Sequence, residues 1–356
     1  MLRGLSRLEV VVIGGVLVLA AVTGALHFAE TSDVATFIVG AGALAGLAWV
    51  VSFATEAVGE RFGPAVTGLL QSTLGNLPEL FIVLFALSAG EIVVAQTSIL
   101  GSLFANALLV LGLALFAGSR AADDKVMRFR ARLPNDTATL LLLAVFIIAL
   151  LALSDSVGDR ASHHRIAISA VGAVVLLVVY AAWLYSYLLG PRAEPAIEQP
   201  AAARRIPLPV SVGLLAASGV GAALVSDWFV DALGPAIERL GISRAFTGIV
   251  IVAIAGNAVE NVAGITLAAK GKSDLAVSVV KNSVAQIAVF LYPTLVLLSL
   301  FFDQRLTFVI PGVYVGALAI MALAVWQVTG DGESSQFEGI ALVALYAILA
   351  VLAFYE

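Results

Sequence analysis

The feature that most constrains the fold of this chain is its succession of long, uninterrupted apolar runs. A helix that crosses a lipid bilayer needs about 20 mostly apolar residues, whereas the strands of a membrane barrel alternate in segments of about ten. The runs here are too long and too continuously apolar for strands, so we expect an all-α membrane protein. Eleven such runs occur, near residues 8–29, 34–55, 64–88, 92–118, 137–153, 166–189, 208–226, 245–269, 274–301, 306–328 and 338–355.

The composition excludes several classes of function. Of the 356 residues, 61% are apolar and 12% charged, against roughly 25% charged in an average soluble domain. The predicted spans leave no room for a nucleotide-hydrolysing domain, and the absence of cysteine excludes thiolate metal sites. A net charge of −5 is too small to imply a nucleic-acid partner. We therefore expect a protein that lies in a lipid bilayer, is not an enzyme and uses no cofactor.

The distribution of Lys and Arg among the loops predicts the orientation in the membrane. Cytoplasmic loops of membrane proteins carry an excess of these residues. With the N-terminus inside, 13 of the 19 Lys and Arg fall on the cytoplasmic side and five on the other, and Lys281 lies within a span. We expect a cytoplasmic N-terminus and an outer C-terminus, in a membrane of the bacterial cytoplasmic type.

A short motif occurs twice and divides the chain into halves. Gly75-Asn76-Leu77-Pro78-Glu79 returns as Gly256-Asn257-Ala258-Val259-Glu260, displaced by 181 residues. The predicted parts are an N-terminal helix (1–30), a five-helix repeat (31–190), a proline-rich linker (191–207) and a second five-helix repeat (208–356). Because five is odd, the second repeat enters the membrane from the opposite side. Inverted repeats are typical of secondary transporters, which bind their substrate where the repeats meet.

Three ionisable residues fall well inside the predicted spans: Glu79, Glu260 and Lys281. A charge at the bilayer centre costs about 2.5–3.5 kcal/mol on insertion scales, so such residues mark functional sites. The two glutamates occupy the same motif position, which favours function over a structural pair of protonated carboxyls. Lys281 and Glu260 lie at similar depth when counted from the turn near residue 272, so pairing is one alternative and snorkelling to the headgroups is another.

Two facing carboxylates suit a divalent cation such as Ca²⁺, which takes six to eight oxygen ligands. Without the metal the carboxylates repel each other and bind protons more readily, so protons and metal compete for one site. The glycines of the motifs would let the helices unwind, and Pro78 removes a backbone hydrogen bond. Further oxygen donors lie at helical spacing around the glutamates, at Asn76, Asn257, Ser102, Asn106, Asn282 and Gln286.

The paired motifs resemble the signature regions of the cation/proton exchanger (CAX) family, a branch of the calcium/cation antiporter superfamily. They are Gly75-Asn76-x-x-Glu79-Leu80 with Gly101-Ser102 and Asn106, and Gly256-Asn257-Ala258-x-Glu260 with Ser283 and Gln286. The resemblance covers spans 2 to 11. It implies an extra first helix before two inverted five-helix units, and export of Ca²⁺ against an inward proton gradient. The implied ion ligands are Glu79 and Glu260, with supporting positions at Asn76, Asn257, Ser102, Asn106, Ser283 and Gln286.

The chain departs from the family pattern in three places. Family members usually carry His where Asn261 follows the second glutamate, and Pro78 is more familiar from the sodium/calcium exchanger branch. Lys281-Asn282-Ser283 stands where a small or apolar residue precedes Gly-Ser. The alternatives are therefore sodium coupling, or an altered ion selectivity in which Lys281 modulates the site or exchanges a proton.

An ion channel is the alternative of a different class, but it gives no reason for internal inverted motifs. The sequence leaves the oligomeric state open, a homo-oligomer included.

Overall fold

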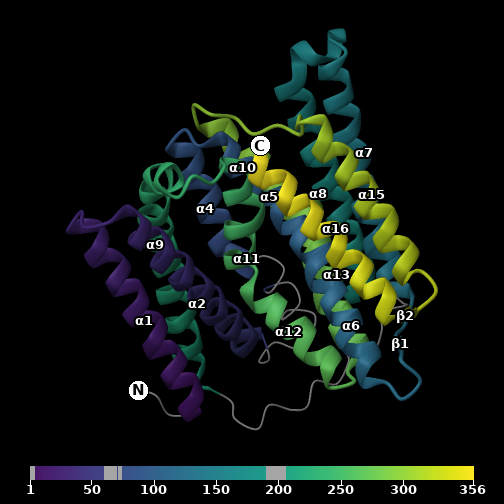
Figure 1. The fold of residues 1–356 in the computed structure, drawn as a ribbon, viewed down its shortest axis with the longest axis horizontal. Coiled ribbons are helices and arrows are strands. Elements are labelled where there is room, and N and C mark those ends of the chain that lie inside the picture. Colours follow the sequence, from purple (N-terminus) through teal and green to yellow (C-terminus); the bar gives the residue numbers. More distant parts are fainter. Residues whose placement is uncertain (1–4, 60–69, 71–73, 190–205) are drawn as a thin grey trace. The chain divides into compact units, whose positions relative to one another are not determined.

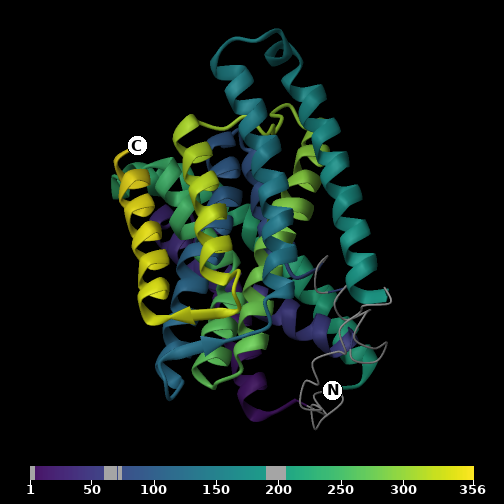
Figure 2. The same ribbon diagram turned by 90° about the vertical axis from the view of Figure 1, so that its right-hand side faces the viewer.

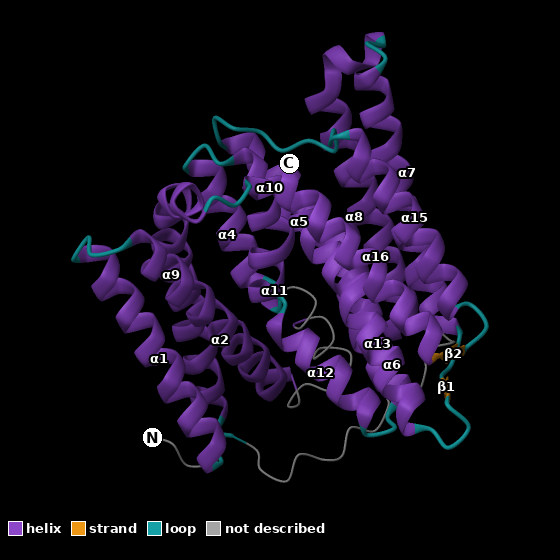
Figure 3. Ribbon diagram, in the orientation of Figure 1, coloured by secondary structure: helices purple, strands orange, loops and turns teal. Residues whose placement is uncertain are grey.

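The computed structural model describes residues 5–59, 70, 74–189 and 206–356. Helices make up almost all of this part of the chain (Figure 3). Nine of the described helices are long and apolar enough to cross a membrane, and one bent pair would be a tenth. The all-helical membrane class is thus confirmed, whereas the predicted count of eleven is not. The first part of the predicted span 64–88 lies outside the described residues, and its second part is the shorter apolar helix α4 (Leu77–Ser88).

The chain forms two compact units. The first consists of Met1–Ala89, Ala182–Ile242 and Ala255–Val259, and the second of Gly90–Ala181, Ser243–Ile254 and Glu260–Glu356. The long helices of the first unit are α1 (Arg7–Phe28), α2 (Asp33–Gly59) and α9 (Leu208–Leu240), and α4 belongs with them.

Helices α1, α2 and α9 lie side by side in the first unit (Figure 1). Phe37 of α2 stacks on Phe229 of α9 with ring centroids 4.9 Å apart. A Cβ on Gly46 of α2 would lie 2.5 Å from Val16 of α1, so glycine permits the close approach of these two helices. Helix α9 runs well past the predicted end of its span, residue 226, because backbone hydrogen bonding does not stop where the apolar run does. It ends at Gly241, whose left-handed φ of 64° suits glycine.

The second unit contains the other elements, and π-helical turns interrupt three of its helical segments. Its elements before the second motif are α5 (Ile92–Phe104), η1 (Ala105–Val110), α6 (Leu111–Ala121), β1 (Val126–Arg128), α7 (Arg132–Ser156), η2 (Arg160–His164), α8 (Arg165–Leu189), α10 (Arg244–Phe246), η3 (Thr247–Val252) and α11 (Ala253–Gly256). After it come α12 (Ala258–Ala269), α13 (Ser273–Gln286), η4 (Ile287–Leu291), α14 (Tyr292–Leu298), η5 (Ser299–Phe301), α15 (Gly312–Thr329), β2 (Glu333–Ser335) and α16 (Gln336–Tyr355). The ends of α8 and α11 and the start of α12 belong to the first unit.

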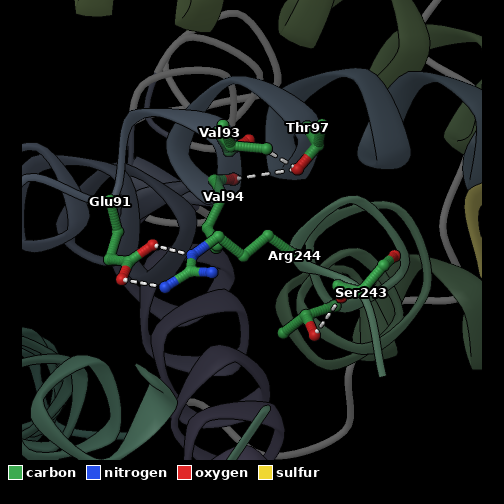
Figure 4. Close-up of polar contacts among 7 residues, drawn as sticks. Glu91, Val93, Val94, Thr97, Ser243 and Arg244 are labelled. Carbon is green, nitrogen blue, oxygen red and sulfur yellow. Dashed lines mark hydrogen bonds and ion pairs between the residues drawn. The ribbon is translucent and has the colours of Figure 1, made fainter. Parts of the chain in front are cut away.

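Helix α5 crosses η3 at a short distance. A Cβ on Gly101 would lie 2.5 Å from the Cα of Ile249, so the crossing requires glycine there. At the start of α5, the guanidinium of Arg244 donates to both carboxylate oxygens of Glu91, over 2.8 and 3.4 Å (Figure 4). The hydroxyl of Thr97 donates to a carbonyl of its own helix over 2.7 Å, so this buried polar group needs no partner from another helix.

A two-stranded antiparallel sheet joins two loops of the second unit, which the sequence pattern did not predict. Strand β1 pairs with β2 so that Val126 lies opposite Ser335 (Figure 2). The hydrogen bond from Arg128, whose guanidinium also lies 3.4 Å from Glu333, holds the pKa of the Asp124 carboxyl below its usual value. Three-residue strands are too short to show recognisable alternation. The pairing brings these two loops together within the second unit.

The apolar run 306–328 is not helical throughout, because α15 begins only at Gly312. The preceding non-helical segment is partly buried, and side chains of neighbouring helices donate hydrogen bonds to its carbonyls. Gln96 donates to the carbonyl of Val309 and Tyr292 to that of Thr307, each over 2.8 Å. Irregular backbone at membrane depth is tolerated where the protein supplies such partners.

The motif displacement of 181 residues recurs in the helix boundaries. Helices α4 (Leu77–Ser88) and α12 (Ala258–Ala269) begin 181 positions apart and also end 181 positions apart. The hairpin turns that follow contain Gly90 and Gly271, both left-handed with φ of 79° and 72°. Helices α5 and α13 each begin two positions after these glycines. The chain therefore repeats its local structure around the two motifs.

Candidate ion-binding site

The first motif places a buried carboxylate at the start of a helix. Asn76 is the N-cap of α4, Pro78 lies in its first turn, and Glu79 follows. Proline suits this position because the first turn has no helical acceptor for its missing N–H. The Glu79 side chain is only 5% exposed. The N–H groups of the first helical turn have no helical acceptor, and they favour negative charge close to them.

The second motif interrupts a helix. Helix α11 ends at Gly256, Asn257 forms a turn, and α12 begins at Ala258. The helical segments before and after the break differ in direction by 61°. Broken helices of this kind expose backbone groups to bound ions in transporters.

The two motifs meet at Glu79. The side-chain amide of Asn257 donates to the Glu79 carboxylate across 178 positions of sequence, and both groups are buried. A Cβ on Gly256 would lie 2.7 Å from Cγ and 3.2 Å from Oε1 of Glu79, so only glycine leaves room for this carboxylate. Residues of the second motif thus hold the glutamate of the first.

Helical spacing alone does not predict this contact. The three-residue spacing predicts that Asn257 lies beside Glu260 of its own motif, and its side-chain amide also reaches the Glu79 carboxylate of the other motif. The helix is interrupted at Asn257, so regular helical spacing does not apply there. The side chain of Glu260 lies outside the described residues. Asn76, 5% exposed, has an amide nitrogen without a hydrogen-bond partner in the part of the chain that the structure describes.

The downstream oxygen donors of the two halves come together in the second unit. The amide of Asn106, in η1, donates to the hydroxyl of Ser283, in α13, over 3.1 Å. Ser102 and Ser283 are both buried and stand 181 positions apart, as the motifs do. Gln286 ends α13 directly before η4 and is half-buried. The π-helical turns at Asn106 and after Gln286 are features that often mark functional sites.

Lys281 is buried in the second unit, with 1% of its surface exposed. Its ammonium lies 3.4 Å from the hydroxyl of Thr329, which donates in turn to the carbonyl of Val325 over 2.6 Å. Thr329 is the last residue of α15, and the C-terminal end of a helix attracts positive charge. No sequence pattern points to Thr329, which is a single hydroxyl at the end of an apolar run. The position 181 residues earlier is the buried Leu100.

Replacing Lys281 by leucine, the residue of the other repeat, should tighten Ca²⁺ binding by about tenfold. A buried positive charge opposes a divalent cation, and a difference of about 1.4 kcal/mol is tenfold in affinity. Isothermal titration of the purified protein with Ca²⁺ measures the effect, with the loop variant Lys272→Leu as the matched control. Unchanged affinity in Lys281→Leu would show that Lys281 only caps α15.

Comparison with known proteins agrees with the paired motifs. A family model described as "Sodium/calcium exchanger protein" matches residues 32–189 and 210–355. The chain is 31% identical to a "Ca(2+)/H(+) antiporter" of Synechocystis, covering 96% of both proteins. It is 33% identical to a "Vacuolar calcium ion transporter" of Schizosaccharomyces pombe, covering 92% of this chain and 80% of the relative. The solved structure of the "Ca2+/H+ antiporter" YfkE matches with a TM-score of 0.79 at 28% identity, covering 96% of this chain and 99% of YfkE.

These matches extend over both repeats and both motifs rather than over one segment, so they concern the whole transport fold. The chain therefore belongs to the sodium/calcium exchanger protein family, in the cation/proton exchanger branch that its paired motifs indicate.

Proposed function

We propose that the protein is a secondary antiporter that exchanges Ca²⁺ for protons across the membrane by alternating access. The observation that supports this most is the buried carboxylate of Glu79, held by Gly256 and Asn257 of the other motif. A carboxylate in this setting is neutralised either by a proton or by a divalent cation. The names of the relatives, Ca²⁺/H⁺ antiporters and a calcium transporter, support the same substrates.

In the proposed cycle Glu79 and Glu260 ligate Ca²⁺, and Asn76, Asn257, Ser102, Asn106, Ser283 and Gln286 supply neutral oxygens or position the ligands. Release of Ca²⁺ on one side leaves two carboxylates that repel each other, and protons taken up there neutralise them. The protonated site then returns to the other side. The protein needs no cofactor and catalyses no covalent chemistry in this mechanism, and a homo-oligomer is not required by it.

Flux into proteoliposomes tests the proposal when proton and sodium gradients are imposed separately. A proton gradient directed out of the vesicles should drive Ca²⁺ uptake, and protons should be released as Ca²⁺ enters. A sodium gradient should have no effect. Uptake driven by sodium alone would favour the alternative of sodium coupling, for which Pro78 is the motivating residue. Ca²⁺ flux that proceeds without any opposing ion would favour a channel.

The proposed orientation has the N-terminus in the cytoplasm and the C-terminus outside. Because the chain has no native cysteine, single cysteines report their side without background. A cysteine at the exposed Asp123 should react with an impermeant maleimide only from the cytoplasmic face, and one at the exposed Glu356 only from the outer face. Labelling of both positions from the same side would contradict an odd number of spans.

A further inference from the structure

Helix α1 belongs to neither of the two predicted repeats, and it contains none of the residues used in the proposed exchange. Its C-terminal end is attached to α9 of the same unit by an aromatic contact. Trp228 of α9 lies so close to the α1 backbone that a Cβ on Gly24 would be 2.9 Å from the indole ring. The ring of Phe28 meets Trp228 edge-on, with centroids 5.7 Å apart.

His27 lies between this indole and a carboxylate of α9. Its imidazole is stacked on Trp228 with ring centroids 6.1 Å apart and an interplanar angle of 24°. Its Nε2 lies 3.9 Å from the carboxylate of Asp231. The imidazole is 25% exposed and the carboxylate 58%, so protons from the adjoining solution reach both.

Other charged groups lie near this end of α1 in the described part of the unit. Asp227, one helical turn before Asp231, is close enough to His27 and Asp231 to interact with both electrostatically. On α2, the carboxylate of Asp33 forms an ion pair with the guanidinium of Arg239, over 3.4 Å. Glu30, on the turn after α1, is exposed. The described carboxylates near His27 therefore give it acidic surroundings.

Protonation of His27 strengthens two contacts in the same direction. An imidazolium forms an ion pair with Asp231, and its charge is also attracted by the face of the indole. A histidine side chain changes its charge between about pH 5 and 8. On neutral His27 both attractions are lost, while the contact of Trp228 with Gly24 remains.

We infer that His27, Trp228 and Asp231 form a pH-responsive clamp that holds the end of α1 against α9 when the solution at this end of the helices is acidic. In the proposed topology this is the outer solution, the source of the protons used in exchange. The clamp contains none of the proposed ion ligands, so it acts on the docking of α1 and takes no part in binding Ca²⁺. The inference rests on the proposed function only for its effect on transport.

Spin labels test the clamp without any transport assay. Cysteines at the exposed positions Ala29 and Glu238 place one label on each helix, in a chain without other cysteines. Lowering the pH from 8 to 5.5 should narrow the distance distribution between the labels in the parent protein. A surface ion pair is worth up to about 1 kcal/mol, so we expect about a fivefold rise in the ratio of docked to undocked α1.

The variants separate His27 from other titrating groups. His27→Gln should abolish the pH response, Asp231→Asn should reduce it, and His27→Lys should keep α1 docked even at pH 8. His163→Gln, in an exposed turn of the second unit, is the matched control and should respond as the parent does. A response in His27→Gln as large as in the parent would overturn the clamp.

Transport provides the second readout. In proteoliposomes, the dependence of Ca²⁺ flux on the pH at the outer face should be flatter in His27→Gln than in the parent and His163→Gln, by about twofold to fivefold. Identical profiles in all three proteins would contradict the regulatory role even if the labels show the clamp. Failure of Ca²⁺/H⁺ exchange in the parent would instead contradict the proposed function and leave the distance measurement valid.

Discussion

Glutamine in place of Glu79 is expected to weaken Ca²⁺ binding by at least about a hundredfold and to abolish exchange. The amide keeps the volume of the side chain and its hydrogen bonding, but it cannot neutralise a divalent cation or carry a proton. Removing one partner of a buried charge pair costs about 3–5 kcal/mol, and 1.4 kcal/mol is tenfold in affinity. Ca²⁺ titration and proton-driven uptake in proteoliposomes measure the two losses.

The same substitution at Glu260 should have the same result, because that residue occupies the equivalent motif position. Glu238→Gln, on an exposed turn near the end of α9, removes a carboxylate elsewhere and should leave transport unchanged. All three variants should show the thermal transition of the parent. Parental Ca²⁺ transport by Glu79→Gln or Glu260→Gln would remove that residue from the ligand set.

Much of the fold could be predicted because lipid imposes a simple rule on the sequence. Spanning segments are long and apolar, so each predicted run contains helix in the residues that the structure describes. The exceptions occur where the protein itself, and not lipid, surrounds the backbone. The segment before Gly312 is apolar but not helical, and Gln96 and Tyr292 donate hydrogen bonds to its carbonyls. Hydropathy alone cannot distinguish such a non-helical apolar segment from a helix.

The candidate site residues can be singled out from the sequence, but the contacts that the structure shows among them cannot. Buried charge in a membrane is costly enough that Glu79 and Lys281 are conspicuous in the sequence. Their partners depend on tertiary contacts, which spacing along a single helix does not contain. Asn257 binds the glutamate of the other motif, and Lys281 lies against Thr329 at the end of α15. Depth in the membrane could be counted from the turns, but the direction of each side chain could not.

Alanine in place of Gly256 is expected to weaken Ca²⁺ binding by about fivefold to a hundredfold. The new Cβ would lie 2.7 Å from Cγ of Glu79, so the carboxylate or the helix break must shift. Overpacking of a buried site costs about 1–3 kcal/mol, and here the cost falls on the arrangement that holds the ligand. Gly219→Ala in α9 is the matched control, since its Cβ would meet nothing within 4 Å, and it should bind Ca²⁺ as the parent does.

Two causes of the Gly256→Ala effect can be separated by a second substitution. If the Cβ displaces the Glu79 side chain, Glu79→Asp shortens that side chain and removes the clash, so the combined loss is smaller than the sum of the single losses. If alanine instead restores a continuous helix through Asn257, a change favoured by about 1 kcal/mol over glycine, the two losses add. Ca²⁺ titration of the parent, both single variants and the double variant gives this coupling. A combined loss smaller than the sum of the single losses shows that the second motif acts on the ion through the position of Glu79. Parental affinity in Gly256→Ala would show that the contact between the motifs does not hold the carboxylate.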